Sequence, residues 1–139
     1  MRSETLTIRT GSAPVVRDIT ADCARFARGG TADGGRDGVL HVFVPHATAG
    51  VAILETGAGS DDDLLRTLGT LLPADNRWRH RHGSPGHGRD HVLPALVAPY
   101  ATVPVLDGRL GLGPWQSICL VDLNVDNPER TVRLSFIVG

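Results

Sequence analysis

The sequence predicts an α+β domain with mixed, largely antiparallel β-sheets and two or three helices. Strand-length runs that are apolar or alternating recur along the chain, whereas only one segment has a strong helical leucine pattern. Asp107-Gly108 stands between two apolar runs, which is typical of a two-residue hairpin turn. The chain has 139 residues, the usual size of one domain, so we expect residues 1–139 to form a single domain around one core.

The predicted strands lie in three parts of the chain. Leu6 and Ile8 alternate with polar residues, a period of two that is typical of a strand. The run GVLHVFVP at 38–45 predicts a well-buried strand, and extended structure is expected to resume at 51–54. Beyond residue 100, the hairpin and the alternating runs WQSICLVDL and TVRLSFIV predict a β-rich C-terminal part.

Two segments are predicted as helices. Thr20 is expected to cap a short helix that ends at Gly29-Gly30, because hydroxyl side chains favour helix starts and glycine favours helix ends. The segment at 31–38 is expected to be a polar loop. Ser60, followed by three aspartates, is expected to cap a second helix, in which leucines recur at helical spacing until Pro73. The later run HVLPALVA fits either a short helix or a strand.

The composition excludes several classes of protein. A net charge of −1 with 41% hydrophobic and 21% charged residues is typical of a soluble globular chain, and it provides no bulk charge for binding nucleic acid or an anionic membrane. No apolar run approaches the roughly 20 residues of a transmembrane helix, and the first ten residues are too polar for a signal peptide, so we expect a cytoplasmic protein. The basic residues are all arginine, which excludes lysine-dependent chemistry. Cys23 and Cys119 are isolated and are expected to be reduced structural thiols.

The stretch RHRHGSPGHGRDH at 79–91 concentrates four histidines within a long irregular segment. Loops of this length inside a compact domain are usually functional or disordered. The spacings HxH and HxxxH place pairs of imidazoles on one face of a strand or of a helix, and imidazole suits zinc, copper, iron and nickel. The residues alone leave three interpretations open: a bound metal, an anion-binding or catalytic loop, and a solvated loop.

Three motifs together resemble one known family. PHATAGVAILE at 45–55, GRDH at 88–91 and VPVLDGRLGLGPWQ at 103–116 look like the YjbQ-like family, which also carries the name secondary thiamine-phosphate synthase. The match is collinear from about residue 38 to the C-terminus. The resemblance implies a compact α+β fold that assembles as a homotrimer, with the shared polar positions in one cleft.

The resemblance also assigns site residues by motif. His46 and Thr48 match the family's histidine-threonine motif, Glu55 matches the glutamate after the next strand, and His91 matches the histidine of an aspartate-alanine-histidine motif. Its tryptophan-glutamine pair falls on Trp115 and Gln116. The chain departs from the family pattern at four positions within these motifs, which would belong to a metal or phosphate site: Ala47, Leu54, Arg89 and Pro114.

The family name implies thiamine-phosphate synthesis, which joins a hydroxymethylpyrimidine diphosphate to a thiazole phosphate with loss of diphosphate. Such a transfer needs the two rings held together and the leaving diphosphate neutralised by a divalent cation and arginine. We therefore expect a divalent metal, Mg²⁺ or Zn²⁺, and a small phosphorylated metabolite as partner. Two alternatives remain: a non-enzymatic trimer that binds an anionic metabolite or a metal, and a metal-dependent hydrolase.

The expected roles divide the candidate residues into three sets. The catalytic set is His46, Glu55 and His91; the metal-binding set is His46, His87 and His91; and the substrate-binding set is Thr48, Arg89, Arg109, Trp115 and Gln116. Arg81 is a further candidate for a phosphate contact. His91 is expected to matter most and His87 next, whereas His80 and His82 are more typical of solvated loop residues. In a trimer, we expect the long loop to reach a neighbouring subunit's cleft.

Overall fold

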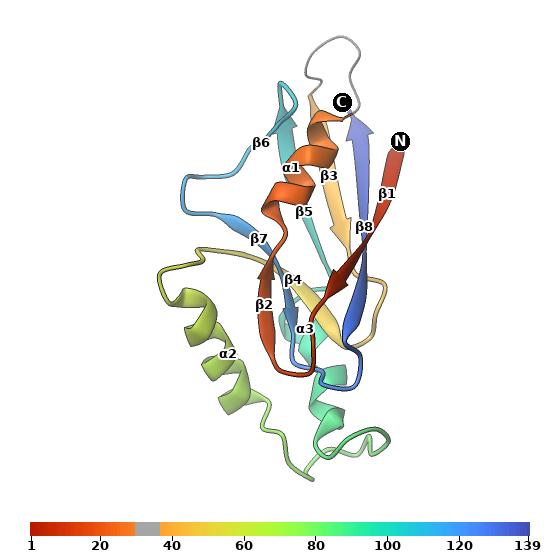
Figure 1. Ribbon diagram of the computed structural model, residues 1–139, viewed down its shortest axis with the longest axis vertical. Coiled ribbons are helices and arrows are strands. Elements are labelled where there is room, and N and C mark those ends of the chain that lie inside the picture. The colour runs from red at the N-terminus through yellow and green to blue at the C-terminus, as the bar shows by residue number, and fades with distance from the viewer. Residues whose placement is uncertain (30–36) are drawn as a thin grey trace.

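The computed structural model describes residues 1–29 and 37–139, and in this part of the chain eight strands form two antiparallel sheets with helices packed on them (Figure 1). The larger sheet has the order β1 (Arg2–Arg9), β8 (Glu129–Val138), β3 (Gly38–Phe43), β5 (Tyr100–Leu106) and β6 (Arg109–Leu110). The smaller sheet has the order β2 (Val15–Asp18), β7 (Ser117–Asp122) and β4 (Ala49–Leu54). The predicted fold class is confirmed, while the predicted loop at 31–38 lies almost entirely outside the described residues.

Three α-helices and one 3₁₀ helix complete the described part of the chain: α1 (Thr20–Arg28), α2 (Ser60–Leu71), η1 (His87–His91) and α3 (Leu93–Leu96). The run HVLPALVA therefore ends η1 and forms α3, so the helical alternative is correct. None of the described helices is both long and apolar enough to cross a membrane.

The two predicted helix starts are confirmed, but their caps are not the predicted hydroxyls. The Asp18 carboxylate accepts a hydrogen bond from the Thr20 amide at 2.8 Å, and Thr20 Oγ1 accepts one from the Ile118 amide at 2.9 Å. Gly59 occupies the N-cap of α2 at φ 101°, so Ser60 is already helical and makes no capping hydrogen bond within the described residues. A helix start is thus decided by the backbone conformation of the preceding residue as well as by side-chain type.

The β5–β6 hairpin has the predicted turn. Asp107 and Gly108 lie at positive φ, 50° and 69°, which is the conformation that a two-residue type I′ turn requires at both central positions. Aspartate tolerates this region and glycine enters it without strain, so the pair specifies the register in which Val105 faces Leu110.

The main core lies between the two sheets and α1. Leu40 and Leu134 from the larger sheet, Ile118 and Leu120 from the smaller sheet, and Phe26 from α1 are all buried in it. Both cysteines are free and buried, and burial raises the pKa of the Cys23 and Cys119 thiols to about 12. Both thiols are therefore protonated at neutral pH, as expected of structural cysteines.

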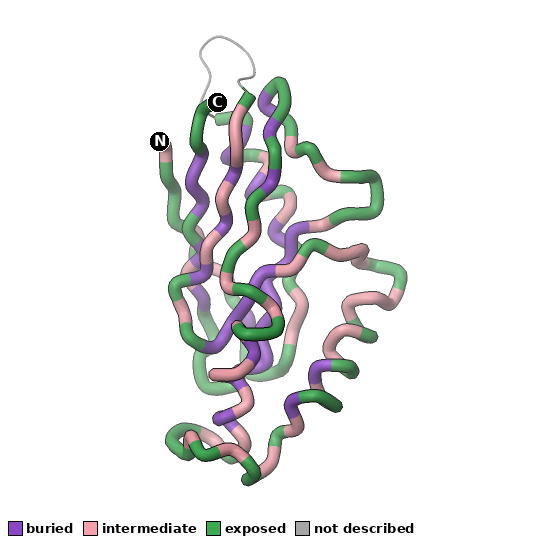
Figure 2. The backbone as a smooth tube through the Cα atoms, turned by 180° about the vertical axis from the view of Figure 1, so that it is seen from behind, coloured by how far each residue is buried: buried purple, intermediate pink, exposed green. Residues whose placement is uncertain are grey.

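A second apolar cluster covers the other face of the smaller sheet. Leu68 and Leu72 near the end of α2 pack with Leu93 of α3 and with Val121 and Leu123 at the end of β7. Figure 2 shows the buried residues concentrated along the strands, while much of the loop after α2 is exposed or intermediate. This cluster fixes both ends of the histidine segment, because α2 precedes that segment and α3 follows it.

The smaller sheet has two ends that prove chemically different. At one end Ala49 pairs with Asp122, and at the other Leu54 pairs with Ser117. We call the first the histidine end, since the segment from 79 to 91 lies there, and the second the tryptophan end, since Trp115 and Gln116 directly precede β7. Because β4 and β7 are antiparallel, residues before β4 meet residues after β7 at the histidine end.

Candidate metal centre

Short contacts fold the histidine segment back against the end of α2. Trp78 Nε1 donates a hydrogen bond to the Pro73 carbonyl at 2.9 Å, and the Arg89 guanidinium donates one to the Leu72 carbonyl at 3.2 Å. A Cβ on Gly88 would stand 2.4 Å from the Trp78 Cβ, so only glycine allows this close approach. Gly86, at φ 82°, provides the turn that starts η1.

Four imidazole rings converge in this folded segment. The ring centroids lie between 3.9 Å and 5.8 Å apart for all pairs of His80, His82, His87 and His91. Three of them, His80, His87 and His91, each offer one nitrogen within 4.8 Å of the other two. His87 Nε2 and His91 Nε2 are 3.1 Å apart.

The state of these nitrogens suits metal ligation. Two nitrogens each about 2.0–2.1 Å from one tetrahedral zinc ion lie roughly 3.3 Å apart, close to the observed separation of the two Nε2 atoms. Burial and the neighbouring imidazoles lower the pKa of His80 and of His91, which favours the neutral rings that bind metals. His80 Nδ1 makes no hydrogen bond among the described residues, so it is free to bind a water molecule or a metal.

Two carboxylates stand behind His87. Its Nδ1 lies 3.1 Å from Asp126 Oδ2 and 3.2 Å from Asp90 Oδ2, although the angles fall short of ideal hydrogen-bond alignment. His87 and Asp90 are buried, and burial raises the pKa of the Asp90 carboxyl. Carboxylates in this position orient a histidine so that its other nitrogen faces a metal.

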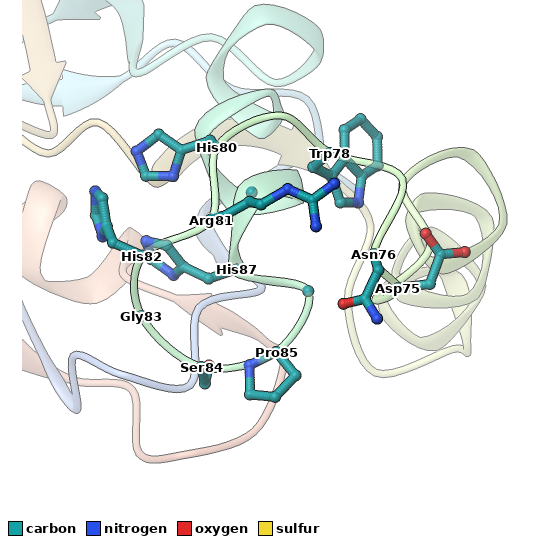
Figure 3. Close-up of a pocket in the computed structure, with 12 residues that line it drawn as sticks. Asp75, Asn76, Trp78, His80, Arg81, His82, Gly83, Ser84, Pro85 and His87 are labelled. Atoms are coloured by element: carbon teal, nitrogen blue, oxygen red, sulfur yellow. The ribbon is translucent and has the colours of Figure 1, made fainter.

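A cavity of about 250 Å³ opens beside the histidines. Figure 3 shows His80, His82 and His87 on one side of it and Trp78 and Asn76 on the other, with the Arg81 side chain reaching between them. The volume is just below the roughly 300 Å³ at which typical small-molecule pockets begin. An aromatic ring, a guanidinium and several imidazoles thus share one small cavity.

Of the predicted metal-binding residues, the structure brings His87 and His91 together and places His46 outside the group. His46 lies at the histidine end, where its Nε2 accepts a hydrogen bond from the Thr131 amide at 3.0 Å. Burial and the nearby Arg130 lower the pKa of His46. Thr48 is buried beside it, and its hydroxyl accepts a hydrogen bond from the Asn124 amide group at 3.1 Å.

The arginine that lines the cavity is Arg81, and Arg89 takes another position. The Arg89 side chain is 12% exposed, donates to the Leu72 carbonyl and lies 3.5 Å from Asp90 Oδ1. It borders a smaller cavity of about 80 Å³. In this position Arg89 fastens the segment to the end of α2.

The remaining predicted residues lie at or near the tryptophan end. Glu55 directly follows β4, and Gln116 directly precedes β7. Arg109 and Gln116 line a second cavity of about 290 Å³, together with Arg28 and the apolar Ala24, Leu110 and Leu112. Trp115 is 73% exposed. Within one chain, the predicted site residues therefore form two groups, which lie at opposite ends of the smaller sheet.

Two residues of the site, His80 and Asp126, are not predicted as site residues from the sequence, for different reasons. His80 belongs to the HxH pair, so its spacing is a usable signal, although the sequence alone favours a solvated loop residue. Asp126 lies in the turn NVDNPER and carries no local signal, because its contact with His87 joins residues 39 positions apart.

The two sheets and the imidazole cluster define a small α+β protein with a candidate metal centre in one loop. The chain belongs to the YjbQ-like family: the model of the UPF0047 protein YjbQ-like family matches residues 4–139. The match includes most of the N-terminal part, in which the sequence shows no family motif.

Named relatives agree with this assignment. The chain is 70% identical over 103 residues to a UPF0047 protein of Mycobacterium tuberculosis, covering 74% of this chain and 77% of the relative. The solved structure of a hypothetical protein from Aeropyrum pernix is 30% identical and covers 100% of both chains with a TM-score of 0.85. A YjbQ-like structure from Sulfolobus solfataricus, 22% identical with a TM-score of 0.89, covers 99% of this chain and 97% of its own and supports the fold alone. These names state no activity, so any chemistry must be argued from the site.

Proposed function

We propose that the protein is a metal-dependent enzyme that acts on a small phosphorylated metabolite, with the metal held by His80, His87 and His91. The observation that carries this proposal is the convergence of three imidazole nitrogens within 4.8 Å. Three protein ligands with a further position open to water or substrate are typical of catalytic zinc sites. Arg81 lines the same cavity and supplies a cation for phosphate oxygens.

The donor set favours Zn²⁺ over Mg²⁺. Magnesium prefers oxygen ligands in octahedral geometry, whereas imidazole suits zinc and its transition-metal neighbours. Bound at these histidines, the metal supplies a Lewis acid for a phosphate oxygen and an activated water. His82, whose ring centroid is 3.9 Å from that of His80, stands close enough to act as an additional ligand or as a proton carrier.

Hydrolysis of a phosphorylated metabolite is the reaction that this ligand set supports best. The chain provides three imidazoles for the metal, Arg81 for the phosphate and Trp78 as an aromatic wall of the same cavity. None of these roles requires a residue from the tryptophan end. The small cavity favours a substrate with one ring or a short chain.

The second candidate is the transfer that joins a hydroxymethylpyrimidine diphosphate to a thiazole phosphate. The family motifs favour it, because Glu55, Trp115 and Gln116 match the family pattern although they lie away from the histidine cavity. A transfer of this kind needs room for two rings, and Arg109 and Gln116 line the second cavity, which has a volume of about 290 Å³ in the single chain.

We also propose that the protein is a homotrimer, and the outer face of the larger sheet supports this. His41 stacks near Phe43 and Tyr100 on that face, and Leu106 and Ile137 are exposed on it. Residues that alternate with them, such as Leu40 and Val42, face the core. An exposed apolar sheet face is typical of a subunit interface, and light scattering would report the mass.

Metal analysis of the untagged protein tests the proposed function. We expect about one equivalent of zinc in the wild type and its loss in His80→Ala and His91→Ala, because each variant removes one ligand. Arg66→Ala is the control, since Arg66 pairs with Asp63 on the exposed face of α2, away from the histidines. His46→Ala decides whether His46 belongs to the metal set. A wild type without bound metal, even after zinc is added, would contradict the proposal.

Turnover then separates the candidate reactions. A hydrolase should release phosphate from a panel of small phosphate esters, lose that activity with a chelator and regain it with zinc. The transferase should form thiamine phosphate from the two phosphorylated rings. Metal and ligand binding without turnover above background would instead support the non-enzymatic binder.

A further inference from the structure

A path of hydrogen bonds runs from the buried end of the smaller sheet to Asp126, whose carboxylate lies against the back of His87. We propose that Asp126 is the positioning residue of the site: its carboxylate holds His87 Nδ1 so that His87 Nε2 faces His91 and the metal. This inference rests on the proposed metal site and deepens it. Asp126 lies in the loop that connects β7 to β8.

The geometry of His87 supports this role. The ring is buried, with Nδ1 3.1 Å from Asp126 Oδ2 and Nε2 3.1 Å from His91 Nε2. An imidazole has two nitrogens, so a proton held on Nδ1 by a carboxylate leaves the lone pair on Nε2. With the proton on Nδ1, the side that faces Asp126, the lone pair of Nε2 faces His91, and this is the tautomer that a metal needs at this point.

Of the two carboxylates near His87, Asp126 is the one held in place by a further hydrogen bond. Its Oδ2 also accepts a hydrogen bond from the Ser84 amide at 3.1 Å. Asp90 is 3% exposed, and its Oδ1 has no hydrogen bond among the described residues. The oxygen of Asp126 that faces His87 is therefore fixed by a second hydrogen bond, which orients it toward the ring.

The loop that carries Asp126 is tied to the core in successive steps. The Asp126 amide donates to Asn124 Oδ1 at 2.7 Å, and the Asn124 amide donates to Asp122 Oδ1 at 2.9 Å. The Asn124 side chain also donates to Thr48 Oγ1 at 3.1 Å. Asp122 in turn accepts two hydrogen bonds from the fully buried Arg130, at 2.6 Å and 3.0 Å. A carboxylate held in this way has little freedom to leave His87.

Gly83 shows that the contact depends on close approach. Its φ is 82°, and a Cβ at this position would stand 2.8 Å from Asp126 Oδ2 and 2.9 Å from His87 Cγ. A side chain at residue 83 would therefore separate the two groups. This provides a second variant that disturbs the contact while keeping every charged residue.

The experiment measures the affinity of the metal-free full chain for Zn²⁺ by competition with a chromophoric chelator, and the visible spectrum of the Co²⁺ form. Asp126→Asn should weaken Zn²⁺ affinity about 10- to 100-fold, as is typical when a residue that orients a metal ligand is lost. The Co²⁺ spectrum should change with it, and Gly83→Ala should shift both in the same direction. Asp126→Glu, which keeps the charge, should recover part of the affinity.

Asp63→Asn is the control, because Asp63 pairs with Arg66 on the exposed face of α2. Metal-free thermal melts show whether each variant is folded. If the wild type binds zinc while Asp126→Asn and Gly83→Ala bind it equally well with the same Co²⁺ spectrum, the positioning role is overturned and the metal site stands. If the wild type binds no metal, the proposed function fails, and the role of Asp126 fails with it.

Discussion

The histidine end and the tryptophan end of the smaller sheet both place a carboxylate beside polar partners, but they use it differently. At the tryptophan end, Asp18 accepts hydrogen bonds from the Thr20 amide and the Thr56 hydroxyl, and so holds backbone segments together. At the histidine end, Asp126 faces a buried imidazole whose other nitrogen points to a second imidazole. Asp18 therefore stabilises the fold, whereas Asp126 is placed to orient His87, a candidate metal ligand.

The residues that match the family motifs are divided between the histidine end and the tryptophan end. The histidine end contains the three candidate metal ligands, the carboxylate of Asp126, a cavity and an arginine within one chain. The tryptophan end contains a larger cavity with two arginines and a glutamine, together with an exposed tryptophan beside it. The histidine end can therefore be tested as a metal site on its own. Variants at the tryptophan end then test whether that end also affects metal binding.

The largest expected effect comes from breaking the support of the histidine end. Arg130→Met leaves Asp122 as a buried carboxylate without its partner, which typically costs about 3–5 kcal/mol in the free energy of unfolding. Arg77→Met removes an exposed pair with Asp75 and should change the free energy of unfolding far less. Urea unfolding of the metal-free proteins measures both changes. If both variants lose the same free energy of unfolding, the buried Arg130–Asp122 pair does not stabilise the histidine end.

The second prediction ranks the histidines within the cluster. His80→Ala should weaken Zn²⁺ binding by more than the roughly 100-fold upper limit for residues that only orient a ligand, because His80 belongs to the group of three. His82→Ala should have a smaller effect, since His82 lies outside that group. Chelator competition on both variants gives the two dissociation constants, and the reverse order would mean that His82 is the third ligand.

Much of the fold follows from local signals, whereas the site follows only in part. Alternation predicts the strands, and Asp107-Gly108 predicts the hairpin, because each depends on neighbouring residues alone. His87 and His91 lie four residues apart, and the sequence already marked both. The contact between Asp126 and His87 depends on how Gly83 and Gly86 turn the loop, which no periodicity expresses.

The third prediction tests the role of Asp18 by pH. Burial raises the pKa of Asp18, but hydrogen bonds from Thr20, Ser117 and Thr56 together lower it below its ordinary value of 3.8. A carboxyl whose pKa is lower in the folded state stabilises the protein above its unfolded pKa, and this contribution is lost as the pH falls through the folded pKa. Because Asp18 is exposed and water screens its contacts, Asp18→Asn should therefore cost no more than about 1 kcal/mol at pH 7 and progressively less below pH 4. Unfolding curves at both pH values measure this, and a difference that does not depend on pH would contradict the explanation.

The smallest expected effect is on metal binding when the tryptophan end is changed. Arg109→Ala removes a guanidinium from the second cavity, and Gln116→Ala removes the side chain that accepts a hydrogen bond from the Gly113 amide at 2.8 Å. Because neither residue belongs to the histidine cavity of its own chain, the Zn²⁺ dissociation constant should stay within about twofold of wild type, the scatter expected for distant and independent sites. Chelator competition at several protein concentrations measures it. A larger loss that appears only when the protein is assembled would mean that the tryptophan end of one subunit closes on the histidine end of another, which would favour the two-ring transfer over hydrolysis within a single chain.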